Sequence, residues 1–125
     1  MAGLTPSSRV DCPRTLKVGG RTYKNYDDYP SAHLGRIDLR TAFAQSCNTT
    51  MGALANRLPA DALTSTARQF GIGSDFVIPG ITTVTGRVPE AGTPSLRVEN
   101  GIGQGTVTVS PFGLALAEAS LARRR

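Results

Sequence analysis

Apolar residues recur at steps of three or four along the middle of the chain, which is the period of an α-helix. The positions that follow this period are Leu39, Phe43, Cys47, Met51, Leu54 and Leu58. Periodicity alone permits one long helix, but the polar run 46–50 consists of modest helix formers. We therefore expect two helices, over about 38–46 and 49–58. Asn48 or Thr49 is expected to cap the second helix.

The same period predicts two more helices. One runs from about Asp61 to Phe70 and ends at Gly71. The other covers 110–122, where Ser110 suits the N-cap and Pro111 the first helical position. The expected buried stripes are Leu63, Ala67 and Phe70 on the first of these helices, and Leu114, Ala117 and Leu121 on the second.

Strand signals are short and few. Leu16–Val18 and Arg21–Tyr23 flank two glycines and predict a β-hairpin. Segment 71–99 reads as mostly irregular, with short strands near 76–78 and 81–85, because its prolines argue against a large sheet. Residues 1–11 read as a flexible lead-in. The pattern as a whole predicts a mainly α chain with irregular loops and a short β-hairpin.

Composition narrows the classes of protein that this chain can represent. With 125 residues, the chain is one domain or part of one. The net charge of +5 comes largely from Arg123–Arg125, without which 11 basic residues face 9 acidic ones. Aromatic residues make up only 6%, and no stacking pattern or zinc spacing accompanies the charge, which argues against nucleic-acid binding. No stretch is apolar enough to cross a membrane, and no secretion signal is visible.

Ser46 and Asn48 are the main candidates for a site. In an extended turn, residues two apart point to the same side of the backbone, so both side chains can face one ligand. A hydroxyl can pass a proton, and a carboxamide can donate and accept hydrogen bonds without changing charge. The pair lacks a strong base. The competing interpretation is that both residues only cap a helix.

The two cysteines allow one disulfide at most, and the sequence leaves open whether Cys12 and Cys47 meet. A second interpretation makes Cys47 a nucleophile with His33, the only histidine, as its base. The acidic pair Asp27–Asp28 can bind a cation, although adjacent carboxylates are usually solvated. The glycine-rich segment 101–105 matches no phosphate-binding motif, and its glycines are expected to let the backbone pack tightly against a neighbour.

Several segments, in their order, resemble the transpeptidase domain of class B penicillin-binding proteins, with actinobacterial or mycobacterial lipoprotein-type members as the nearest comparison. The segment around Ser-x-Asn reads Ala42-Phe43-Ala44-Gln45-Ser46-Cys47-Asn48-Thr49. The other matching segments are Cys12-Pro13, 19–23, 67–73, 101–105 and 109–117. The likeness covers roughly residues 10–122 and is far more specific than Ser-x-Asn alone.

The resemblance implies the helical subdomain of an α/β fold shared with serine β-lactamases. It also implies a D,D-transpeptidase that cross-links peptidoglycan stem peptides through a serine acyl-enzyme, reacts with β-lactams and needs no cofactor. By resemblance, Ser46 takes part in proton transfer around the nucleophile, and Asn48 hydrogen-bonds the amide of the substrate or β-lactam. The implied location is extracytoplasmic and associated with the cell membrane.

The chain departs from the family in lacking two of its three motifs, Ser-x-x-Lys and Lys-Thr-Gly. We therefore expect residues 1–125 to be a partial transpeptidase domain, with 12–125 as the helical subdomain region, and to be inactive alone. Without the rest of the domain, an apolar face is left unburied. We expect such a piece to dimerise, aggregate or remain partly disordered. The alternative function is a noncatalytic penicillin-binding-like module that contacts a partner.

Overall fold

All β-structure in the described residues, 3–123, consists of separate two-stranded antiparallel pairs in this computed structural model. The pairs are β1 (Arg9–Cys12) with β4 (Gly35–Asp38), β2 (Thr15–Val18) with β3 (Arg21–Lys24), β5 (Val77–Ile78) with β6 (Ile81–Thr82), and β7 (Gly86–Arg87) with β8 (Thr108–Val109). The predicted hairpin is confirmed as β2–β3. Gly19 and Gly20 form its turn, with φ of 58° and 75° that favour glycine.

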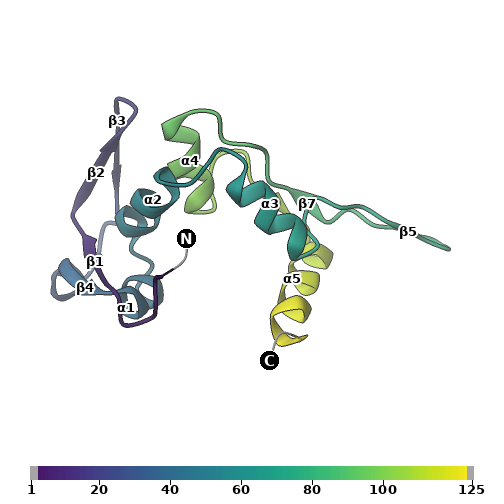
Figure 1. The fold of residues 1–125 in the computed structure, drawn as a ribbon, viewed down its shortest axis with the longest axis horizontal. Coiled ribbons are helices and arrows are strands. Elements are labelled where there is room, and N and C mark those ends of the chain that lie inside the picture. The colour runs from purple at the N-terminus through teal and green to yellow at the C-terminus, as the bar shows by residue number, and fades with distance from the viewer. Residues whose placement is uncertain (1–2, 124–125) are drawn as a thin grey trace.

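Helices make up most of the ordered structure. They are the 3-10 turn η1 (Ser31–His33), α1 (Leu39–Ala44), α2 (Asn48–Asn56), α3 (Ala62–Gln69), α4 (Pro94–Gly101) and α5 (Pro111–Arg123). Figure 1 shows the chain as two lobes: β1–β4, α1, α2 and α4 form one, and α3, β5, β7 and α5 form the other. The fold class predicted from the sequence, mainly α with a short hairpin, is confirmed.

The predicted break between the first two helices is also confirmed. Asp38 caps α1 by accepting a hydrogen bond from Thr41 N at 2.6 Å. Ser46, between α1 and α2, has a φ of 56° and is the one non-glycine residue of the described chain with positive φ. The expected cap of the second helix was wrong. Cys47 is the N-cap without a side-chain bond, and Asn25 Oδ1 accepts from Thr49 N at 3.2 Å instead.

The short strands expected near 76–78 and 81–85 are present as β5 and β6, but two predictions of irregular structure were wrong in part. Within the expected flexible lead-in, residues 9–11 belong to strand β1, and the buried side chain of Val10 packs in the core around the two cysteines. Met1 and Ala2 lie outside the described residues. In the segment expected to be irregular, α4 begins at Pro94, and the Thr93 hydroxyl accepts from Leu96 N at 3.2 Å. Thr93-Pro94 is a helix-start signal that sequence reasoning passed over.

Helices α2 and α4 approach closely because glycines lie at their crossing. A Cβ on Gly52 would come within 2.8 Å of Val98 Cγ1, and a Cβ on Gly101 would overlap Ala55 Cβ. Real Cβ contacts are longer than this, so a side chain at either position would push the helices apart. The expected tight packing at Gly101 is therefore confirmed, although it occurs inside a helix rather than at a turn.

The predicted start of the last helix is confirmed, because Ser110 Oγ accepts from Gly113 N at 2.9 Å.

The second lobe leaves much apolar surface uncovered. The expected buried stripe on that helix was wrong, because Leu114 and Leu121 are 52% and 54% exposed. The chain exposes 8147 Å², whereas a compact monomer of this mass exposes roughly 6,400 Å². In the described part of the chain, no helix is both long and apolar enough to span a membrane.

Candidate Ser-x-Asn site

Ser46 and Asn48 line one pocket at the junction of α1 and α2. The pocket has a volume of about 250 Å³ and is also lined by Phe43, Met51, Gly101 and Ile102; we call it the SxN pocket. The structure therefore brings both predicted site residues to one cavity. The extended-turn geometry was wrong, however. Ser46 is left-handed, and Asn48 is the first residue of a helix.

The polar groups of the SxN pocket are largely free to meet a ligand. Asn48 Nδ2 donates to Lys24 O over 3.4 Å, while Asn48 Oδ1 takes no hydrogen bond from residues 3–123. The Ser46 hydroxyl also has no hydrogen-bond partner within that range, although the backbone N–H of Ser46 donates to Phe43 O at 3.0 Å. No residue that lines the pocket carries a charge. The site offers a hydroxyl and an amide but no base of its own.

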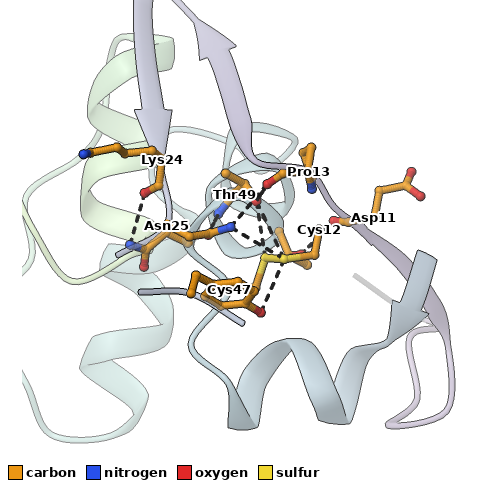
Figure 2. Close-up of a disulfide and its surroundings, with 10 residues drawn as sticks. Asp11, Cys12, Pro13, Lys24, Asn25, Cys47 and Thr49 are labelled. Atoms are coloured by element: carbon orange, nitrogen blue, oxygen red, sulfur yellow. Dashed lines mark hydrogen bonds between the residues drawn. A yellow bond between two sulfur atoms is a disulfide. The ribbon is translucent and has the colours of Figure 1, made fainter. Parts of the chain in front are cut away.

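A disulfide joins the residue between Ser46 and Asn48 to strand β1. Cys12 and Cys47 are both buried, and their Cα atoms lie 6.3 Å apart (Figure 2). This finding answers the question of pairing that the sequence left open. The hypothesis that Cys47 is a nucleophile with His33 as its base was wrong, because a disulfide sulfur has no thiolate to attack with.

Buried polar side chains next to the disulfide hold the first turn of α2 in place. Thr49 Oγ1 donates to Pro13 O and Thr50 Oγ1 donates to Asp11 O, both at 2.7 Å. Asn25 Nδ2 also donates to Pro13 O, at 3.2 Å, and Figure 2 shows these groups meeting beside the sulfurs. These hydrogen bonds were not predicted from the sequence. The available signal was the run of two threonines after Asn48, since buried hydroxyls must find acceptors.

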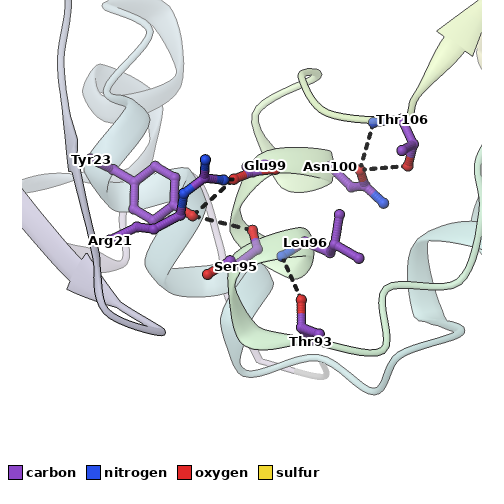
Figure 3. A network of polar contacts seen from close by, with 8 residues as sticks. All are labelled: Arg21, Tyr23, Thr93, Ser95, Leu96, Glu99, Asn100 and Thr106. Carbon is purple, nitrogen blue, oxygen red and sulfur yellow. Dashed lines mark hydrogen bonds and ion pairs between the residues drawn. The ribbon is translucent and has the colours of Figure 1, made fainter.

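A second set of contacts holds α4, whose end forms the other wall of the SxN pocket. Glu99 forms an ion pair with Arg21 and accepts from the Tyr23 hydroxyl at 3.1 Å, so the hairpin β2–β3 is attached to α4 (Figure 3). Asn100 Oδ1 accepts from both the backbone N and the hydroxyl of Thr106, each at 3.4 Å. These bonds fix the end of α4, where Gly101 and Ile102 reach the SxN pocket.

Two carboxylates of this lobe, those of Asp38 and Asp27, are held by hydrogen bonds. Hydrogen bonds from the Thr41 side chain and backbone lower the pKa of Asp38, with Arg9 and Arg40 adding smaller attractions. Asp27 accepts from Lys24 Nζ at 2.6 Å, which lowers the pKa of Asp27 and raises that of Lys24. Asp27, one of the two carboxylates considered for a cation, therefore has an ammonium partner.

Comparison with known families identifies the class of protein that this fold and site define. Residues 2–124 match the family described as penicillin binding protein transpeptidase domain, and the chain therefore belongs to that family. It is 31% identical over 126 residues to the peptidoglycan D,D-transpeptidase PbpA of Mycobacterium tuberculosis. That match covers 97% of this chain and 25% of the relative, so the chain spans about a quarter of the length of the curated relatives it matches.

Solved structures agree with this assignment. Penicillin-binding protein A of M. tuberculosis, in its imipenem acyl-enzyme complex, is 30% identical with a TM-score of 0.86, over 97% of this chain and 28% of that chain. PBP2 of Pseudomonas aeruginosa is 27% identical with a TM-score of 0.80, and the match covers 97% of this chain and 28% of that chain. PBP2 of Helicobacter pylori, in complex with MreC, is 18% identical with a TM-score of 0.73, and the match covers 90% of this chain and 22% of that chain. At this identity the likeness shows the fold alone. The predicted resemblance to class B penicillin-binding proteins is confirmed.

Proposed function

We propose that this chain forms the Ser-x-Asn part of a peptidoglycan D,D-transpeptidase, which cross-links stem peptides outside the cytoplasmic membrane and is acylated by β-lactams. The observation that carries the proposal is the SxN pocket, where Ser46 and Asn48 both face one cavity with unpaired polar atoms. The names of the relatives support the reaction: one is a D,D-transpeptidase, and another was solved as an imipenem acyl-enzyme complex.

The two polar residues have different tasks in this proposal. Ser46 passes a proton between the nucleophile and the leaving group, because a hydroxyl can accept and donate in the same step. Asn48 positions the ligand. Its free Oδ1 accepts a hydrogen bond from the amide N–H of the peptide or of the β-lactam side chain, while its Nδ2 remains on Lys24 O. The hydrogen bonds of Thr49 and Thr50 fix this arrangement before the substrate arrives.

The nucleophile comes from sequence other than these 125 residues, which contain neither Ser-x-x-Lys nor Lys-Thr-Gly. Ser46 cannot replace it, because no residue lining the SxN pocket can act as a base. We infer that the chain is inactive alone and docks on the remainder of the transpeptidase domain through its exposed apolar surface. The large exposed area and the match to a quarter of the relative support this inference.

Site variants of the longer gene product test the proposal. Ser46→Gly removes the hydroxyl while fitting the positive φ, and Asn48→Ala removes the amide. We expect Ser46→Gly to slow acylation by a fluorescent penicillin at least tenfold, since proton transfer by a positioned side chain typically contributes about 10²–10⁴ in rate. Asn48→Ala should slow it roughly tenfold, because the ligand loses a hydrogen bond. Ser74→Gly and Gln104→Ala, at exposed positions, serve as controls. Unchanged acylation in both site variants would contradict the roles proposed for Ser46 and Asn48.

A further inference from the structure

Two adjacent residues at the end of β3 hold two adjacent residues at the start of α2. Lys24 O accepts a hydrogen bond from the side-chain Nδ2 of Asn48 at 3.4 Å, and Asn25 Oδ1 accepts from Thr49 N at 3.2 Å. Within residues 3–123, the carboxamide of Asn48 forms no other hydrogen bond. The orientation of the Asn48 carboxamide therefore depends on where the carbonyl of Lys24 lies.

The side chain of Asn25 fixes the peptide group that carries this carbonyl. The C=O of Lys24 and the N–H of Asn25 belong to one planar peptide unit, so they move together. Asn25 is only 6% exposed, and its Nδ2 donates to Pro13 O at 3.2 Å while its Oδ1 holds Thr49 N. The side chain thus bridges the segment after β1 and the start of α2 (Figure 2). A side chain bonded at both ends keeps one conformation, and the backbone beside it stays in place.

The side chain of Lys24 takes no part in this arrangement. Its Nζ donates to Asp27 Oδ1 at 2.6 Å, and both side chains are largely exposed. The contact with Asn48 is made by a main-chain carbonyl, which any residue at position 24 would supply. The buried side chain that controls the position of this carbonyl is therefore that of Asn25.

We propose that Asn25 is a positioning residue for ligand binding at the SxN pocket: through its bonds to Thr49 N and Pro13 O, it holds the Lys24 carbonyl against Asn48 and fixes the Asn48 carboxamide in one orientation. This inference rests on the proposed function, because it assumes that Asn48 bonds the amide of a peptide or of a β-lactam. One N–H of Asn48 stays on Lys24 O, which leaves Oδ1 and the second N–H for the ligand. A planar amide on the ligand meets these two atoms only when they are held in fixed places.

Two β-lactams separate this role from a merely structural one. Penicillin G carries a side-chain amide, whereas imipenem carries a hydroxyethyl group in its place, and a hydroxyl rotates to donate or accept as its partner requires. The test measures the second-order rate constants for acylation of the longer gene product by each compound, from time courses of intact mass. The readout is the ratio of the two rate constants. Partial unfolding lowers both rates equally and leaves the ratio unchanged, whereas a carboxamide of Asn48 that is free to rotate slows acylation by penicillin G alone.

Two variants of Asn25 are compared with wild type. Asn25→Asp keeps the acceptor for Thr49 N but loses the donor to Pro13 O, and Asn25→Ala removes both bonds. In each variant the ratio of penicillin G to imipenem should fall by about threefold to tenfold, which corresponds to one weakened hydrogen bond to the ligand. Because Asn25→Asp keeps the cap of α2, it serves as the test even if Asn25→Ala does not fold.

Thr83→Val is the matched control, because it also removes a buried hydrogen-bonding side chain. Thr83 is 5% exposed, and its hydroxyl accepts from Phe76 N at 3.2 Å in the other lobe. Sites that share no contacts act independently, so the ratio in Thr83→Val should stay within about twofold of wild type. A wild-type ratio in both Asn25 variants, or an equal fall in Thr83→Val, would overturn the positioning role.

The proposed function fails in a different way from the positioning role. A wild-type protein that neither compound acylates would overturn the transpeptidase. Crystal structures of the longer gene product, as wild type and as Asn25→Asp, then decide the positioning role without any acylation. Asn48 Nδ2 should bond Lys24 O in wild type and lose this contact in the variant. An unchanged contact in Asn25→Asp would overturn the inference.

Discussion

At the scale of single residues, the side chain of Asp38 caps the start of α1. Asp38 is half-buried, and the hydrogen bonds from Thr41 stabilise its ionised form. Its pKa in the folded chain is therefore below the ordinary value of about 3.9. A carboxyl with a lowered folded pKa contributes stability above the unfolded pKa, and this contribution is lost as the pH falls through the folded pKa.

Asp38→Asn tests this effect, because asparagine caps helices about as well as aspartate but carries no charge. We expect wild type to be the more stable protein at pH 6 and its advantage over Asp38→Asn to shrink as the pH is lowered from about 5 to about 2. Urea unfolding at several pH values in this range measures the difference, and all other acidic groups cancel between the two proteins. A difference independent of pH would show that the charge of Asp38 contributes nothing.

At the scale of elements, the site depends on how closely α2 and α4 cross. Alanine is normally about 1 kcal/mol better than glycine in a helix, yet a Cβ on Gly101 would overlap Ala55 Cβ. The clash should outweigh the propensity, because overpacking costs about 1–3 kcal/mol. We therefore expect Gly101→Ala to lower the free energy of unfolding by a net amount of up to about 2 kcal/mol.

Gly92→Ala is the matched control for this prediction. A Cβ on Gly92 would have no other group within 4 Å, and Gly92 does not have a positive φ. Its substitution should therefore change stability by less than about 0.5 kcal/mol. Denaturant unfolding of both variants gives the comparison. A Gly101→Ala protein more stable than wild type would mean that the two helices can separate freely.

Sequence reasoning recovered the elements whose signals are local. The break between the first two helices, the hairpin at Gly19–Gly20 and the Ser110-Pro111 helix start were all correct. It missed β1 because that strand pairs with β4, 26 residues further along, and such a partner leaves no local period. It placed Leu114 and Leu121 inside because their spacing fits a buried stripe, but the chain provides no layer to cover them.

The two residues predicted for the site lie together, but their geometry differs from the prediction. Ser46 and Asn48 came from motif and resemblance, and the structure places both on one pocket. Asn25 caps α2 while it bonds Pro13, and Cys47, the residue after the left-handed Ser46, is joined to Cys12 by the disulfide. Interactions of this kind lie outside what spacing along a helix can indicate.

The whole molecule has the surface of a piece that packs on something larger. Exposed large apolar side chains include Phe43 at 77%, beside the SxN pocket, and Val77 at 85%, on the projecting strand β5 (Figure 1). Large exposed apolar side chains on both lobes favour burial against a further layer of structure. In our account the remainder of the transpeptidase domain covers them. Self-association of the chain through the same surface stays a prediction.

The most direct measurement is covalent labelling by a fluorescent penicillin followed by intact mass, on this chain and on the longer gene product that contains it. The account predicts that only the longer protein gains the mass of one penicillin, because the nucleophile lies outside the 125 residues while Ser46 and Asn48 complete its site. Labelling of this chain alone would contradict the account and place the nucleophile within it. If neither protein is labelled, the noncatalytic module replaces the transpeptidase.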